Sequence, residues 1–249
     1  MNNNPFSLIN KTILVTGSSS GIGASVAIEC SKLGAKLIIT GRDLDNLNKT
    51  YKELHGLGHI QVIADLNKDE DIKALVSEIP EIDGIVHSAG ILGTIPFGFI
   101  TKGKIDEIFA INFASPILLS KNLLKYNKLK KNSSIVWISS IAGNLITSSG
   151  SSLYGASKSA INGIAKGMAL ELASKKIRVN VVSPGVIKTN IFNSGIISDN
   201  DLNMEVVKYP LKRFGNPEEV AFGVIYFLSN ASSWTTGSCL TIDGGYTLL

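Results

Sequence analysis

The sequence predicts an α/β fold, a doubly wound parallel sheet of about seven strands with helices on both faces. Short β-branched apolar runs alternate with longer segments of helical periodicity along the whole chain. The chain has 249 residues, 44% hydrophobic and 18% charged, so it can bury one large core. We therefore expect a single domain over residues 1–249, with residues 186–215 as a substrate-binding loop region within it.

Composition excludes several classes of function. The net charge of +4 is spread along the chain, so we expect no nucleic-acid partner. Cys30 and Cys239 match no metal-site or disulfide spacing, so we expect no metal and two buried thiols in a reducing compartment. The first ten residues lack a signal pattern, and no run of about 18 apolar residues occurs. We expect a cytoplasmic protein without a membrane partner.

The predicted strands and helices follow one another in strict alternation. The strands are expected at residues 12–16, 36–40, 60–64, 83–87, 134–139, 178–182 and 239–242. The helices are expected at residues 24–33, 43–56, 68–78, 104–126, 154–173 and 217–228. The last helix has a clear start, because Asn216 can cap it and Pro217 suits its first position. In such a sheet, ligands bind in a crevice at the carboxyl ends of the strands.

The first predicted strand leads into a glycine-rich turn and then into a helix. This order is typical of a phosphate site, because glycines let the backbone approach closely and a helix N-terminus offers free N–H groups. Serine hydroxyls in the turn can also donate to phosphate. The residues assigned to cofactor binding here are Gly17, Ser19, Ser20, Gly21, Ile22 and Gly23. A glycine turn without a ligand is the alternative.

The end of the second strand indicates which dinucleotide binds. An acidic residue there would bond the ribose 2′-hydroxyl, whereas an arginine can pair with a 2′-phosphate. Gly41 followed by Arg42 favours NADP(H), with NAD(H) as the alternative. The other interpretation is that Arg42 is only a solvated residue and that Asp43 caps the next helix.

Two further strand ends add cofactor-binding candidates at the same edge. Asp65 and Leu66 follow the third strand, and Asp65 either accepts from the adenine amino group or caps the next helix. Ser88, Ala89 and Gly90 follow the fourth strand, where small residues let a cofactor lie against the backbone. His87, just before them, has no evident partner that would make it catalytic.

Tyr154 and Lys158 lie four residues apart, so a helix places both on one face. An ammonium beside a phenol favours the phenolate and should lower the pKa of Tyr154, so that it transfers a proton near neutral pH. Ser140 follows the fifth strand at the same edge, where its hydroxyl either holds a substrate oxygen or only caps the loop.

Pro116 interrupts the long helix predicted at residues 104–126. Proline has no N–H, so the carbonyl of Asn112 loses its usual helical partner and can hold a water; alternatively, Pro116 only bends the helix. Downstream, the basic run 125–131 is interpreted as a solvated face, although it could meet an acidic carrier protein. Residues 186–210 show little pattern, which is typical of a substrate-binding loop.

These motifs together resemble the short-chain dehydrogenase/reductase family over essentially the whole chain. The ordered set is Thr16-Gly17-x-x-x-Gly21-x-Gly23, Ala89-Gly90, Asn112, Ser140, Tyr154-x-x-x-Lys158, Pro184-Gly185 and Asp243-Gly244-Gly245. The resemblance implies a Rossmann-type oxidoreductase in which hydride passes between nicotinamide and a carbonyl or secondary alcohol. It also implies a homotetramer.

The resemblance also implies a role for each matched residue. Tyr154 would exchange a proton with the substrate oxygen, and Lys158 would lower the pKa of Tyr154 and bond the nicotinamide ribose. Ser140 would hold the substrate oxygen, and the Asn112 carbonyl would hold a relay water. The residues that would cover the nicotinamide are Pro184, Gly185, Ile187 and Thr189, the last two meeting its carboxamide.

Two positions depart from the family pattern. Ser88 replaces the usual asparagine, which removes a side chain that would brace the central strands. The gap between Ser140 and Tyr154 is one residue longer than in many relatives, so Ser139 is a second candidate for the serine role.

Within the family, the chain is similar to 3-oxoacyl-acyl-carrier-protein reductases. The expected substrate is therefore a small molecule, first a 3-oxoacyl thioester that a carrier protein could deliver. The alternatives are a sugar, polyol or steroid-like alcohol, or a nucleotide-binding scaffold that has lost catalysis.

Overall fold

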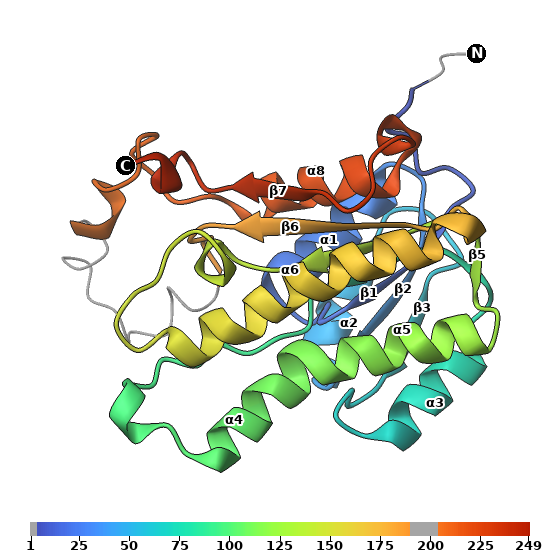
Figure 1. Ribbon diagram of the computed structural model, residues 1–249. Helices are drawn as coiled ribbons and strands as arrows, with labels where there is room; N and C mark the ends of the chain where they lie inside the picture. The colour runs from blue at the N-terminus through green and yellow to red at the C-terminus, as the bar shows by residue number, and fades with distance from the viewer. Residues whose placement is uncertain (1–3, 190–203) are drawn as a thin grey trace.

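The computed structural model describes residues 4–189 and 204–249, and a parallel sheet forms its centre (Figure 1). Within these residues seven strands pair in the order β3-β2-β1-β4-β5-β6-β7. They are β1 (Thr12–Thr16), β2 (Lys36–Gly41), β3 (Ile60–Ile63), β4 (Ile82–His87), β5 (Leu129–Ile138), β6 (Arg178–Pro184) and β7 (Cys239–Ile242). All six pairings are parallel, which confirms the predicted doubly wound sheet. The strand order reverses between β1 and β4, where such sheets open a ligand crevice.

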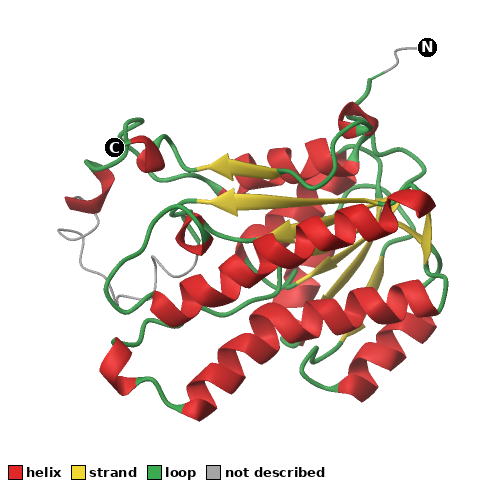
Figure 2. Ribbon diagram, viewed as in Figure 1, coloured by secondary structure: helices red, strands yellow, loops and turns green. Residues whose placement is uncertain are grey.

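Helices cover both faces of the sheet (Figure 2). One face packs against α1 (Gly21–Lys32), α2 (Leu44–Lys52) and α8 (Pro217–Leu228). The other packs against α3 (Asp69–Glu78), α5 (Ser115–Lys125) and α6 (Ser152–Leu172), while α4 (Lys102–Phe109) precedes α5. In β1, Ile13 and Val15 face the first layer and Leu14 faces the second, because successive strand residues point to opposite faces. Both faces are therefore buried, and the strands read as continuous apolar runs.

Several boundaries differ from the predictions. Strand β5 begins at Leu129 rather than at residue 134. Its polar first part lacks the apolar pattern of a buried strand, and it pairs with β4 at Ile82 before the register shifts. Helix α2 ends at Lys52 rather than at Gly56, since Gly56 takes a positive φ of 95° that no helix contains. Cys30 is buried as expected, but Cys239 is exposed, because it begins β7 at the edge of the sheet.

The predicted interruption of the long helix takes the form of a wider turn. Between α4 and α5, residues 110–114 form a π-helical turn, and the amide of Ser115 bonds the carbonyl of Ala110, five residues back. The Ser115 hydroxyl also donates to that carbonyl, at 2.7 Å. Pro116 then occupies the start of α5, a position where its missing N–H is tolerated. The π-turn buries Asn112 and aims it toward the carboxyl edge of the sheet.

Thr16 joins the carboxyl ends of the two central strands. Its hydroxyl oxygen accepts the backbone N–H groups of Ser88 and Ala89, each at 3.2 Å. The contact is so close that a Cβ on Gly17 would lie 2.7 Å from the Cα of Ala89. Thr16 thus holds the segment after β4 against the glycine-rich turn, so bracing does not depend on an asparagine at position 88.

Among the described residues, no helix has the length and apolar character that a membrane span requires.

Replacing Thr16 with valine keeps the side-chain shape but leaves two amides without their acceptor. We expect the free energy of unfolding to fall by about 1–3 kcal/mol and cofactor binding to weaken. Denaturant unfolding and a cofactor titration measure the two effects. Thr12→Val, at the opposite end of β1, is the matched control, and an equal effect of both variants would contradict the bracing role.

Candidate active site

A cleft of about 1060 Å³ opens at the carboxyl ends of the strands. Its wall contains each cofactor-binding residue assigned from the sequence, and also Ser140, Tyr154 and Lys158. The cofactor-binding residues in this wall are Gly17, Ser19, Ser20, Gly21, Ile22, Gly23, Arg42, Asp65, Leu66, Ser88, Ala89, Gly90, Pro184, Gly185, Ile187 and Thr189. Asn112 lies behind the wall, 1% exposed. Elements from both halves of the chain thus build one site.

The glycine-rich turn fits a dinucleotide phosphate. Gly17 and Gly21 take positive φ angles of 67° and 56°, and a Cβ on Gly23 would collide with the carbonyl oxygen of Gly17. Helix α1 begins at Gly21 with no acidic residue in its first turn, so its N-terminus favours an anion. The Ser18 hydroxyl points away from this site, because it is buried and donates to the carbonyl of Val15 at 2.7 Å.

Arg42 lies exposed on the cleft wall at the end of β2, beside Asp43. The Asp43 carboxylate caps α2, accepting from the backbone N–H of Asn46 at 3.0 Å and from its side-chain amide at 2.6 Å. These two bonds lower the pKa of Asp43. The carboxylate of Asp43 is thus engaged at the start of α2, while Arg42 stays exposed on the cleft wall.

Asp65 also lies on the cleft wall, but it does not cap the following helix. The N-cap of α3 is Lys68, while the Asp65 side chain accepts from the amide of Asn67 at 3.2 Å. Its own amide donates to Asp71 at 2.8 Å. The adenine interpretation of Asp65 stays a prediction.

Tyr154 and Ser140 meet inside the cleft. The phenol of Tyr154 hydrogen-bonds the Ser140 hydroxyl, and burial, the larger effect, raises the pKa of Tyr154 above its ordinary 10.0. Ser140 also accepts from the backbone N–H of Ala142 at 3.2 Å. Ser139 also lines the cleft, but its buried hydroxyl is engaged, because it donates to the carbonyl of Lys158 at 3.1 Å. The geometry therefore favours Ser140 over Ser139 for the serine role.

Lys158 lies beneath Tyr154 and is buried. Its ammonium donates to the carbonyl of Ile138 at 2.9 Å, and its Nζ lies 5.8 Å from the centroid of the Tyr154 ring. Burial lowers the pKa of Lys158 to about 8. The expected lowering of the Tyr154 pKa by Lys158 is thus absent from this structure, because burial dominates both groups and the ammonium is directed at a carbonyl.

Asn112 connects three parts of the site through its side chain. Its Oδ1 accepts from the amide of Ile91 at 2.8 Å, and its Nδ2 donates to the Ile91 carbonyl at 3.0 Å and to the Ser157 hydroxyl at 3.1 Å. A Cβ on Gly90 would lie 3.2 Å from this Oδ1 and 3.4 Å from the Lys158 Nζ. Sequence reasoning assigned Asn112 a main-chain role, which stays a prediction, and missed this side-chain brace.

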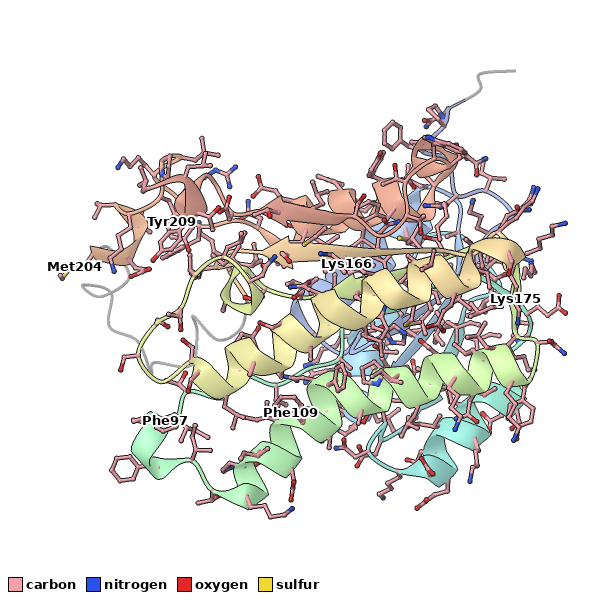
Figure 3. All side chains as sticks on the ribbon, viewed as in Figure 1. Phe97, Phe109, Lys166, Lys175, Met204 and Tyr209 are labelled. Carbon is pink, nitrogen blue, oxygen red and sulfur yellow. The ribbon has the colours of Figure 1, made fainter. Side chains whose placement is uncertain are left out.

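The outer part of the cleft contains polar residues that sequence reasoning did not name individually. They are Thr94, Thr147, Ser148, Ser151, Glu205, Tyr209 and Tyr246. Glu205 and Tyr209 fall inside the predicted substrate-binding region 186–215, of which residues 190–203 lie outside the described part of the chain. Figure 3 shows Tyr209 near the C-terminal segment. These residues are scattered along the chain, so only one signal was available, the turn at Asp243. Its carboxylate accepts from the amides of Gly245 and Thr247, each at 2.9 Å, and so directs Tyr246 back toward the cleft.

The comparisons with known proteins agree with this geometry. A family model described as enoyl-(acyl carrier protein) reductase matches residues 17–247. The chain is 36% identical to an L-xylulose reductase of Caenorhabditis elegans, over 97% of each protein. It is 34% identical to a 3-oxoacyl-(acyl-carrier-protein) reductase of Rickettsia prowazekii, over 96% of this chain and 97% of the relative.

Among solved structures, a short-chain type dehydrogenase/reductase from Mycobacterium marinum matches with a TM-score of 0.89 and 30% identity, over 98% of both chains. A dehydrogenase/reductase from Sinorhizobium meliloti matches with a TM-score of 0.87 and 29% identity, over 97% of both chains. The similarity in sequence and in fold extends over nearly the whole chain, and the cleft contains the residues that the family pattern assigns to the site, with Asn112 buried behind its wall. The protein therefore belongs to the short-chain dehydrogenase/reductase family of oxidoreductases acting on CH–OH and C=O groups.

Proposed function

We propose that this protein is an NADP(H)-dependent reductase of a ketone, with a 3-oxoacyl thioester as the first candidate substrate. The observation that carries the proposal is the convergence of Ser140, Tyr154 and Lys158 in one cleft beside a glycine-rich phosphate cradle. With the catalytic groups all present, an inactive scaffold is the weakest alternative. We also propose that the protein is cytoplasmic, as its composition indicates, and a homotetramer, as the family resemblance implies.

The three side chains divide the work of carbonyl reduction. A bound dihydronicotinamide would supply the hydride, and Lys158 would hold its ribose. The Ser140 hydroxyl would donate to the substrate carbonyl oxygen, a fixed dipole that needs no reorganisation. The Tyr154 phenol would then give its proton to that oxygen. Because burial raises the pKa of Tyr154, the phenol holds its proton at neutral pH, the state that reduction requires.

NADP(H) is supported by the surroundings of Arg42. The guanidinium lies exposed on the cleft wall, and the neighbouring Asp43 is engaged in capping α2. A planar guanidinium binds phosphate oxygens in pairs, so a 2′-phosphate is its natural ligand at this position. Ser19 adds a hydroxyl nearby, since a Cβ on Gly41 would overlap the Ser19 Oγ.

Two substrate classes remain in competition. The similarity to a 3-oxoacyl-(acyl-carrier-protein) reductase favours a thioester. The hydroxyl groups of Thr147, Ser148 and Ser151 on the outer cleft wall favour a hydroxylated ketone such as a sugar. The basic run 125–131 joins the end of α5 to the start of β5, so it lies at the amino ends of the strands. The cleft lies at their carboxyl ends, so a carrier protein that delivers a substrate would not dock on this run.

The direct test follows NADPH oxidation with an acetoacetyl thioester and then with a panel of ketoses and simple ketones. We expect turnover of at least one carbonyl, and a loss of at least about 100-fold in Tyr154→Phe with NADPH affinity retained, since only the proton donor is removed. Tyr126→Phe, at an exposed position, is the control. An unaffected Tyr154→Phe would refute the proposed mechanism, and a protein inactive with every carbonyl would support the scaffold alternative.

Cofactor choice is tested with Arg42→Asp. The carboxylate would repel a 2′-phosphate and accept from a ribose hydroxyl, so the ratio of kcat/KM for NADPH over NADH should fall by about 100-fold, roughly 3 kcal/mol. Lys52→Asp at the far end of α2 makes the same charge change away from the cleft. If both variants keep the wild-type ratio, Arg42 does not recognise the phosphate.

Lys158→Met should exchange activity for stability. Because burial lowers the pKa of Lys158 from 10.5 to about 8, the unfolded chain binds more protons between these two pH values. Stability therefore rises with pH through this window, and the charged form costs stability below it. We expect the free energy of unfolding of the variant at pH 7 to exceed that of the wild type by about 2–3 kcal/mol, less the contribution of the lost bond to Ile138. The variant should therefore unfold at a higher temperature, with a smaller gain at pH 10.

Thermal unfolding at the two pH values measures this difference, with Lys166→Met on the exposed side of the same helix as control (Figure 3). A Lys158→Met variant that is less stable than the wild type by the same amount at both pH values would contradict a buried, destabilising ammonium.

A further inference from the structure

We propose that Glu205 and Tyr246 form the element of the cleft that selects the substrate, by hydrogen bonding a neutral hydroxyl or amide group on the chain that extends from the reacting carbonyl. This inference rests on the proposed function and adds the substrate chemistry. Both residues line the cleft that contains Ser140 and Tyr154. They lie 41 positions apart in the sequence, and only the fold brings them together.

The Tyr246 hydroxyl and the Glu205 carboxylate contact each other, but this contact does not use all of their hydrogen-bonding capacity. The Tyr246 hydroxyl donates to the Oε1 of Glu205 at 3.4 Å, which is long for an O–H···O bond. The other carboxylate oxygen, Oε2, is paired with Lys208 at 2.6 Å. Oε1 therefore keeps acceptor capacity for a ligand donor, since a carboxylate oxygen can accept about two hydrogen bonds.

The Tyr246 side chain is held rigidly. Its ring packs on that of Tyr209 with centroids 4.7 Å apart, and Tyr209 is 1% exposed and contacts Phe214 edge-on at 5.5 Å. The turn before Tyr246 is fixed by Asp243, which also accepts from the Thr247 hydroxyl at 2.7 Å. A hydroxyl placed in advance binds a ligand without the entropic cost of ordering a loose side chain.

This chemistry excludes an alkyl chain at the same position. A saturated chain would desolvate the Oε1 atom of Glu205 without replacing its hydrogen bonds to water, and burying a polar atom without a partner is unfavourable. A neutral donor group satisfies Oε1 instead. Such donors come from two sources in the substrates proposed here: the hydroxyls of a sugar-like ketone, and the hydroxyl and amide groups of the pantetheine arm of a thioester.

The test measures binding rather than turnover, with xylitol and pantetheine as probes of the two sources. Ligand-observed NMR gives the Kd of each probe for the enzyme in the presence of NADP⁺. We expect at least one probe to bind, and Glu205→Ala to weaken it about tenfold, since a hydrogen bond to a charged group is lost. Glu205→Gln, which keeps an acceptor oxygen, should restore part of the affinity, and Tyr246→Phe should weaken it about threefold.

Glu78→Ala, an exposed glutamate at the end of α3, is the matched control. If Glu205→Ala does not fold, the affinity of Tyr246→Phe for the probes still tests the proposal. The probe that binds more tightly identifies the source of the donor. The proposal is overturned if neither probe binds the wild type, or if Tyr246→Phe and every folded Glu205 variant bind both probes within twofold of it. Failure of the proposed function would appear separately, as an absence of NADPH oxidation with every carbonyl.

Discussion

The buried ammonium of Lys158 is the constraint on which the site depends. It reaches the cleft between the end of β5, where it donates to the carbonyl of Ile138, and the ring of Tyr154 on its own helix. Burial lowers its pKa to about 8 and raises that of Tyr154, so both groups are held away from their solution behaviour. Such perturbed groups cost stability and cluster at functional sites. Hydrogen bonds from Thr16 and Asn112 brace the segment after β4, which forms the neighbouring part of the cleft wall.

The cleft combines two kinds of chemistry. Its inner part is backbone: positive-φ glycines, the start of α1 and the segment after β4, which together fit a dinucleotide phosphate. Its outer part is made of side chains from distant segments, including Glu205 and Tyr246. A backbone cradle of this kind suits a cofactor, whereas side chains suit the choice of a substrate, since function depends on the site and not on the fold. The proposed selection of the substrate therefore rests on a few outer side chains.

Local sequence patterns predicted most of the fold and of the inner site. The parallel sheet, the glycine turn and the placement of Ser140, Tyr154 and Lys158 followed from alternating periodicity and from the rule that parallel strands share a carboxyl edge. The order of the strands was not predicted. The pKa of Tyr154 was misjudged, because the sequence gives the spacing of Lys158 but neither its burial nor its bond to Ile138. The side-chain brace of Asn112 and the contact between Glu205 and Tyr246 were missed, since both depend on long-range packing.

The protonation state of Tyr154 tests the central claim most directly. Tyrosine labelled with ¹³C at Cζ gives one resonance per phenol, and the Tyr154 signal is the one missing from Tyr154→Phe. A titration of the cofactor-free enzyme should show this phenol ionising above the ordinary value of 10.0, because burial outweighs its bond to Ser140. Ionisation near pH 7 would contradict the account and would show that Lys158 governs the phenol after all.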